Sequence, residues 1–232
     1  MKSLFIKTIS ILGFTILSST NLYAQVEDRL EKSFDVGEHS TLRVNNINGS
    51  VKIITWAQDV IKVDALVVVD RQKDRDNIRV EMLQTSRGVS IETHYDKNKK
   101  NGRYQNSGKV EYVITVPSQT ELSAIELVNG SLSIDGVKGE INAQLVNGSI
   151  KANGIASNGE FSSVNGSIKL HVPSTVDASV NAETMHGSIK TDFGLPVEKN
   201  MFSGRHLSGR IGNGDIKITM ESVNGSVKLL EN

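Results

Sequence analysis

Residues 125–170 read IELVNGSLSIDGVKGEINAQLVNGSIKANGIASNGEFSSVNGSIKL, and the tripeptide Asn-Gly-Ser recurs in this stretch every 18 residues. These three copies begin at Asn129, Asn147 and Asn165, and two further copies begin at Asn48 and Asn224. Degenerate copies, His-Gly-Ser at 186–188 and Asn-Gly-Asp at 213–215, extend the series. A fixed period of about 20 residues is the signature of stacked structural repeats, so this spacing decides the fold.

The residues around each copy alternate in character. In an extended strand, Val or Met, then Gly, then Ile, Leu or Val would lie on one face. Asn, Ser and usually Lys would lie on the other face. This period of two is typical of a half-buried β-strand. We therefore expect outward-pointing lysines and buried side chains at Val128, Val146, Val164, Ile150, Ile168 and Ile189. Clusters rich in Gly and Asn at 135–139 and 153–159 predict corners, so one period holds two short strands and two corners.

The period also predicts the architecture. At about 3.3 Å per residue, 18 residues trace roughly 60 Å, which is enough to wrap once around two walls about 10 Å apart. We therefore predict an all-β protein with a parallel β-solenoid of about 18–20-residue coils at residues 118–232. Strand patterns continue more weakly through 25–117, where we expect a mainly antiparallel β-region that caps the solenoid and is continuous with it.

Residues 1–24 have a different composition. Lys2 and Lys7 precede an apolar run from Ile9 to Leu17, and Ala24 supplies a small residue before Gln25. This pattern predicts a secretory signal peptide cleaved before Gln25. The alternative is an uncleaved anchor, but the run is short for about 30 Å of hydrocarbon. We expect an exported protein, periplasmic, outer-surface or secreted, with no transmembrane segment after cleavage, and the absence of Cys excludes disulfides.

The balance of basic and acidic residues limits the classes of partner that we expect. The chain has 26 basic and 26 acidic residues, and without Lys2 and Lys7 the remainder has a net charge of about −2. Nucleic-acid binders are usually strongly basic, so we expect no nucleic-acid partner. A basic loop at 96–109 could contact an anionic polymer, although such loops are more often simply solvated.

Several segments together resemble a known family. They are Leu-Arg-Val-Asn-Asn-Ile-Asn-Gly-Ser-Val-Lys-Ile at 42–53, Trp-Ala-Gln-Asp at 56–59, Val-Pro at 116–117 and the serial Asn-Gly-Ser turns. On these motifs the chain resembles the bacterial putative adhesin family of exported β-solenoid domains. The resemblance covers most of the chain after residue 24. It implies the fold and export, and it implies no catalytic residues.

Candidate catalytic and metal-binding side chains are scattered. The acidic residues of the repeat region occupy different places in the period and form no acid–base pair by spacing. The histidines stand apart from one another and from close carboxylates: His39, His94, His171, His186 and His206. We therefore predict no enzyme activity, no metal and no cofactor. The aromatic content of 5% also argues against a sugar-binding cleft lined with rings.

Two columns of side chains remain as candidates. The first is a structural turn ladder of stacked amides at Asn129, Asn147, Asn165 and Asn224. These triplets also match the glycosylation acceptor pattern, but a shared turn explains the degenerate copies as well. The second, which we call the lysine column, is a candidate stripe for an anionic ligand formed by Lys151, Lys169, Lys190 and Lys228, with Lys52 and Lys217 at equivalent places. The alternative is a solvated face that discourages sheet aggregation.

The sequence thus favours a non-enzymatic, adhesin-like or scaffold protein of the bacterial envelope. Its repetitive β-wall would contact an envelope or surface polysaccharide or a protein. The alternatives are a carbohydrate-active enzyme on a β-helix and a periplasmic envelope-stress or regulatory partner. The pattern leaves the oligomeric state open.

Overall fold

The computed structural model describes residues 25–96, 99–100, 103–104, 108–199 and 204–232. The predicted signal peptide, at 1–24, and part of the basic loop at 96–109 lie outside these residues. The described residues are all-β, as predicted, apart from one short helix, α1 (Gln72–Arg75). Within the described ranges there is no helix with the length and apolar character needed to cross a membrane.

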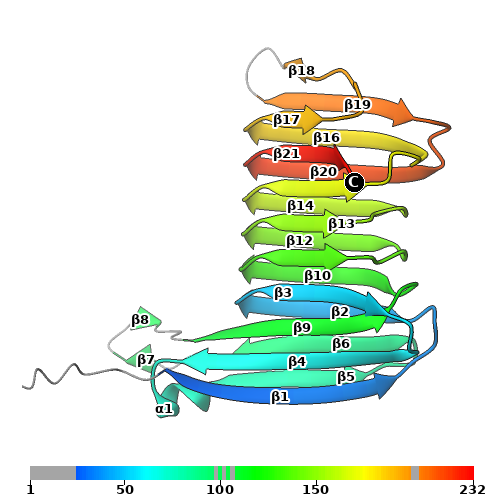
Figure 1. Ribbon diagram of the computed structural model, residues 1–232. Helices are drawn as coiled ribbons and strands as arrows, with labels where there is room; N and C mark the ends of the chain where they lie inside the picture. The colour runs from blue at the N-terminus through cyan, green and yellow to red at the C-terminus, as the bar shows by residue number, and fades with distance from the viewer. Residues whose placement is uncertain (1–24, 97–98, 101–102, 105–107, 200–203) are drawn as a thin grey trace, which may run out of the picture.

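Most strands belong to two sheets that face each other in a tall stack (Figure 1). The nine-stranded sheet has the order β1 (Val26–Asp35), β4 (Val60–Val69), β9 (Lys109–Pro117), β3 (Val51–Trp56), β11 (Leu132–Asp135), β13 (Ile150–Asn153), β15 (Ile168–Val172), β21 (Val227–Glu231), β17 (Ile189–Thr191). The ten-stranded sheet has the order β18 (Glu198–Lys199), β19 (Arg205–Ile211), β16 (Ala178–His186), β20 (Ile216–Asn224), β14 (Gly159–Asn165), β12 (Ile141–Asn147), β10 (Glu121–Asn129), β2 (Thr41–Asn48), β6 (Gly88–Tyr95), β5 (Ile78–Gln84). A separate ribbon pairs β7 (Lys99–Lys100) with β8 (Arg103–Tyr104).

Each Asn-Gly-Ser copy is the corner at which the chain passes from the ten-stranded to the nine-stranded sheet. The Asn ends one strand, and the next strand begins after the Ser, as in β12 and β13. Neighbouring coils pair in parallel with the Asn residues aligned, so Asn129 lies opposite Asn147 and Asn147 opposite Asn165. The degenerate copy at 213–215 is different, because it lies in the turn between β19 and β20, which are both strands of the ten-stranded sheet.

The coils do not stack in the order of the chain. The last coil, β20 and β21, lies between the coil of β14 and β15 and the coil of β16 and β17. Asn165 is therefore paired with Asn224, and Asn224 with His186. In Figure 1 the red strands β20 and β21 accordingly lie beneath β16, and the orange β19 lies above it. Strand β19 then pairs antiparallel with the outer side of β16.

The opposite end of the stack mixes parallel and antiparallel pairing. Strands β1, β4 and β9 pair antiparallel in one sheet, and β5 pairs antiparallel with β6 in the other. The coil of β2 and β3 belongs to the parallel stack, since β2 pairs with β10 and β3 with β11. Residues 25–117 therefore contribute strands to both sheets of the same stack.

The space between the sheets is filled with aliphatic side chains. Ile150, Ile168 and Ile189 are buried, as predicted. The prediction of buried valines is wrong: Val128, Val146 and Val164 are 38%, 42% and 42% exposed. The residue that points inward is one place earlier in the chain, as Leu127 and Leu145 do. The Asn-Gly-Ser corner interrupts the alternation of inward and outward side chains. The pattern of one strand therefore cannot be extended through the corner into the next strand.

Glycine is required at the corners because the coils approach closely there. A Cβ atom on Gly148 would lie 1.8 Å from the carbonyl oxygen of Gly130 in the next coil, and one on Gly166 would lie 1.9 Å from that of Gly148. Contacts this short do not occur between real atoms. The recurrent Gly therefore reflects the stacking of the coils as well as the turn.

Candidate interaction surface

The lysine column lies on the outer face of the nine-stranded sheet. Lys151 is aligned with Lys169, Lys169 with Lys228, and Lys228 with Lys190. Aligned residues on adjacent strands lie about 4.8 Å apart, so the four stems form one continuous row. Lys52 lies in the same row beyond Ser133.

Lys217, by contrast, is not part of the row. It lies on β20 in the ten-stranded sheet, aligned with Ser179, so its predicted equivalence is wrong. The error follows from the copy at 213–215, which is a turn within that sheet and not a corner between the two sheets.

The lysine column carries positive charge that no ion pair within 4.0 Å neutralises in the described residues. Ion pairs in the described parts of the chain involve other residues, and none reaches Lys151, Lys169, Lys190 or Lys228. Each of these side chains is exposed or half-buried. Like charges that lie directly opposite each other destabilise a sheet, so a bound polyanion would relieve a repulsion built into this face.

The Asn side chains form a hydrogen-bonded ladder along the adjacent corner. The Nδ2 of Asn147 donates to Oδ1 of Asn129 at 2.9 Å, and that of Asn165 donates to Oδ1 of Asn147 at 2.8 Å. The ladder continues at both ends, from Asn129 to Asn48 at 2.9 Å and from Asn224 to Asn165 at 2.8 Å. The amides of Asn129, Asn147 and Asn165 thus each donate to the coil on one side and accept from the coil on the other, which ties the coils together.

A row of apolar side chains borders the ladder on the ten-stranded sheet. It contains Val128, Val146 and Val164, and then Val223 and Met185 on the interleaved strands β20 and β16. Met185 is 50% exposed. Contiguous exposed apolar side chains commonly mark contact surfaces. Sequence reasoning missed this row because it assigned the valines to the core.

A shallow groove of about 320 Å³ crosses the same face near the β16 end. Val164, Val223 and Met185 line it together with Glu183 and Glu221, which are aligned on adjacent strands. No spacing in the sequence predicts this pair of carboxylates, because the interleaved strand order brings the two residues together. The groove combines an acidic row with an apolar row, whereas the lysine column occupies the opposite sheet.

The structure also corrects the description of one histidine. His94 is not isolated: its Nε2 lies 3.3 Å from Glu81 Oε2 and 3.8 Å from Glu92 Oε2. His186, in contrast, takes the place of Asn at the end of β16, where it is aligned with Asn224.

Comparison with known proteins shows which family this architecture resembles. Residues 117–230 match the family described as Toastrack DUF4097. Residues 117–230 are therefore similar to a Toastrack domain. The matched residues span β10 to β21, which include the aligned corners and the interleaved C-terminal coil. No curated protein matches the sequence.

Solved structures resemble this chain over most of its length. A putative cell adhesion protein from Clostridium sporogenes ATCC 15579 has a TM-score of 0.61 at 15% identity, covering 88% of this chain and 100% of that chain. A putative adhesin from Bacteroides fragilis NCTC 9343 has a TM-score of 0.35 at 13% identity, covering 87% and 97%. The family match and the first of these structures confirm the resemblance to the putative adhesin family.

Proposed function

We propose that this protein is an exported, non-enzymatic, adhesin-like protein of the bacterial envelope, and that the lysine column binds an anionic polymer such as an acidic polysaccharide. The row of aligned lysines on the outer face of one sheet carries the proposal. The similarity in fold to the putative cell adhesion protein from Clostridium sporogenes supports an adhesive role. In this proposal the antiparallel end caps the solenoid coils and the parallel stack forms the contact wall.

The spacing of the charges fits an extended partner. The row crosses the coils, so the ammonium groups follow the stack axis at intervals of about 4.8 Å. A polymer with regularly placed carboxylates or sulfates can follow such a row and neutralise several lysines at once. A summed field of this kind attracts polyanions and depends on ionic strength, because charges in water are screened over about 8 Å at physiological salt.

The proposal is tested by chromatography of the purified protein on an immobilised acidic polysaccharide such as polygalacturonate. We expect retention at low salt, steep loss of retention as salt rises, and an unchanged polymer length after incubation. Replacing Lys151, Lys169 and Lys190 by Gln should abolish retention while the circular dichroism spectrum stays the same.

A matched control removes the same charge elsewhere. Lys62, Lys109 and Lys138 lie outside the lysine column, and the first two already face carboxylates. Their replacement by Gln should leave most of the retention. An unretained parent protein, or a Lys151/Lys169/Lys190 variant retained as strongly as the parent, would contradict the proposal.

A further inference from the structure

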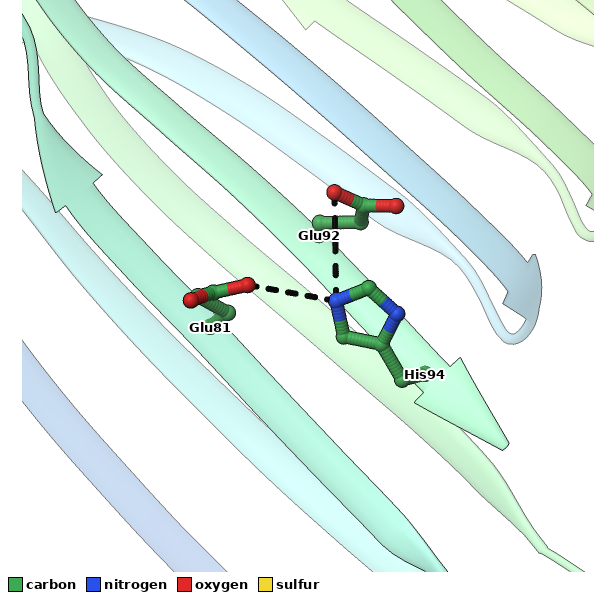
Figure 2. Close-up of side chains that lie close together, drawn as sticks. All are labelled: Glu81, Glu92 and His94. Atoms are coloured by element: carbon green, nitrogen blue, oxygen red, sulfur yellow. Dashed lines mark hydrogen bonds and ion pairs between the residues drawn. The ribbon is translucent and has the colours of Figure 1, made fainter. Parts of the chain in front are cut away.

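Three potential metal ligands converge on the outer face of the ten-stranded sheet, far from the lysine column. Figure 2 shows Glu81 on β5 and Glu92 and His94 on β6, with both carboxylates directed at the imidazole. The His94 Nε2 lies 3.3 Å from Glu81 Oε2 and 3.8 Å from Glu92 Oε2, and the three ligand atoms all lie within 4.8 Å of one another.

The antiparallel hairpin explains this convergence. Glu81 and Glu92 are aligned across β5 and β6, and His94 follows Glu92 by two residues, so all three side chains lie on one face. Two carboxylates directly opposite each other repel, and a cation between them would offset the repulsion. Because the ligands come from regular strands, their backbone positions are fixed by the sheet.

The spacing suits a small divalent metal ion. Zinc lies about 2.0–2.2 Å from His nitrogen and carboxylate oxygen, so two ligand atoms at a tetrahedral centre are separated by roughly 3.3–3.5 Å. The distances of 3.3 and 3.8 Å from His94 Nε2 come close to this value and need only small side-chain rotations. An imidazole ligand favours zinc and similar transition metals over calcium or magnesium, which prefer oxygen.

We propose that Glu81, Glu92 and His94 bind a zinc-like divalent metal ion, with water at the fourth position. The side chains are 44%, 52% and 30% exposed, so the ion can enter from solvent and keep that water. Strand β5 is the edge of the ten-stranded sheet, and the ion would link it to β6.

Two polar neighbours border the proposed site. Arg79 is aligned with His94 on β5, and Asn45 is aligned with Glu92 on β2. The guanidinium of Arg79 is a cation on the same face, so its charge opposes binding of a metal ion beside His94. Replacing Arg79 by Ala should therefore tighten binding of the ion.

The test is isothermal titration of the untagged protein with ZnCl₂ after treatment with EDTA and removal of the chelator. We expect one zinc ion per chain and a rise in melting temperature. Titration with Co²⁺ should give the visible absorption of a tetrahedral site. His94→Ala and Glu92→Gln should each weaken zinc binding at least tenfold.

Control variants separate this site from other zinc contacts. His186→Ala removes an exposed imidazole elsewhere, and Glu160→Gln removes an exposed carboxylate on β14, farther along the same sheet, so neither should change the affinity. Glu92→Gln is nearly isosteric and keeps the proposal testable if His94→Ala fails to fold. Absence of zinc binding, or equal binding by the parent and Glu92→Gln, would overturn the proposal, whatever the lysine column binds.

Discussion

Tyr112 on β9 combines a buried ring with a buried hydroxyl. It is among the largest fully buried side chains, and its hydroxyl lies 2.6 Å from Thr93 Oγ1 on β6. Burial raises the pKa of Tyr112 to about 12, although the hydrogen bond to Thr93 acts in the opposite direction. Burial and the nearby Tyr112 also raise the pKa of Tyr95, the last residue of β6. These residues link the two sheets close to the antiparallel end.

The raised pKa predicts how stability depends on pH. A Tyr that ionises near 10 when unfolded and near 12 when folded favours the folded state fully below pH 10. This contribution, about 2–3 kcal/mol for a shift of this size, is lost as pH rises from 10 to 12. Urea unfolding between pH 8 and 12 should therefore show a steep fall in the free energy of unfolding above pH 10.

The variant Tyr112→Phe checks the assignment. It should lower stability near pH 8 by about 1 kcal/mol, because Thr93 loses a buried partner. It should also make the alkaline limb of the curve less steep, leaving the contribution of Tyr95, whose pKa is also raised by burial. A variant that follows the parent in parallel up to pH 12 would place the titrating group elsewhere.

Individual residues also show where sequence reasoning reached its limit. The burial of Ile150, Ile168 and Ile189 follows directly from alternation within one strand. The exposure of Val146 does not follow from this alternation. The Asn-Gly-Ser corner lies between Val146 and Ile150 and changes which positions of the next strand point inward. The cluster of Glu81 with His94 could be predicted only by pairing the strands on either side of the turn at 85–87. The sequence pattern did not lead us to predict that hairpin.

At the level of the repeating element, the corner glycines set how closely the coils can stack. In Gly148→Ala the new Cβ would meet the Gly130 carbonyl oxygen at 1.8 Å, and backbone atoms cannot rotate away. We expect a loss of about 1–3 kcal/mol, as for overpacked cores, and a clearly lower melting temperature. Gly37→Ala is the control, because a Cβ there meets no atom within 4 Å. Equal melting temperatures for the two variants would show that the coils can separate at little cost.

The repeat predicted the elements well because each coil has the same chemical needs. A corner residue whose amide can both donate and accept, a Gly without a Cβ and an inward Ile recur wherever one coil stacks on another. The repeat does not predict the order in which the coils stack. Because every coil presents nearly the same edge, Asn224 can pair with Asn165 as well as His186 could, and local pattern does not distinguish these arrangements.

Across the whole molecule, the interleaved coil makes the C-terminus part of the interior of the stack. Strands β20 and β21 separate the coil of β16 and β17 from the coil of β14 and β15. The outer coil therefore precedes, along the chain, the coil that supports it. Long-range pairing of this kind slows folding, since loop closure precedes the gain in contacts.

Truncation after Ile211 tests this arrangement. In a stack built in chain order, removing the last coil would shorten the solenoid and leave the other coils intact, because each repeat contacts only its neighbours. Here it removes one of the two partner strands of β14 and one of those of β16. We expect residues 178–211 to become sensitive to protease and the melting temperature to fall by many degrees, while residues 25–172 stay protected. Adding a synthetic peptide of residues 212–232 should restore protection of 178–211. A truncated protein that keeps these residues protected without the peptide would show that the outer coil can dock directly on β14, and that identical edges, not the connectivity of the chain, determine the order of the stack.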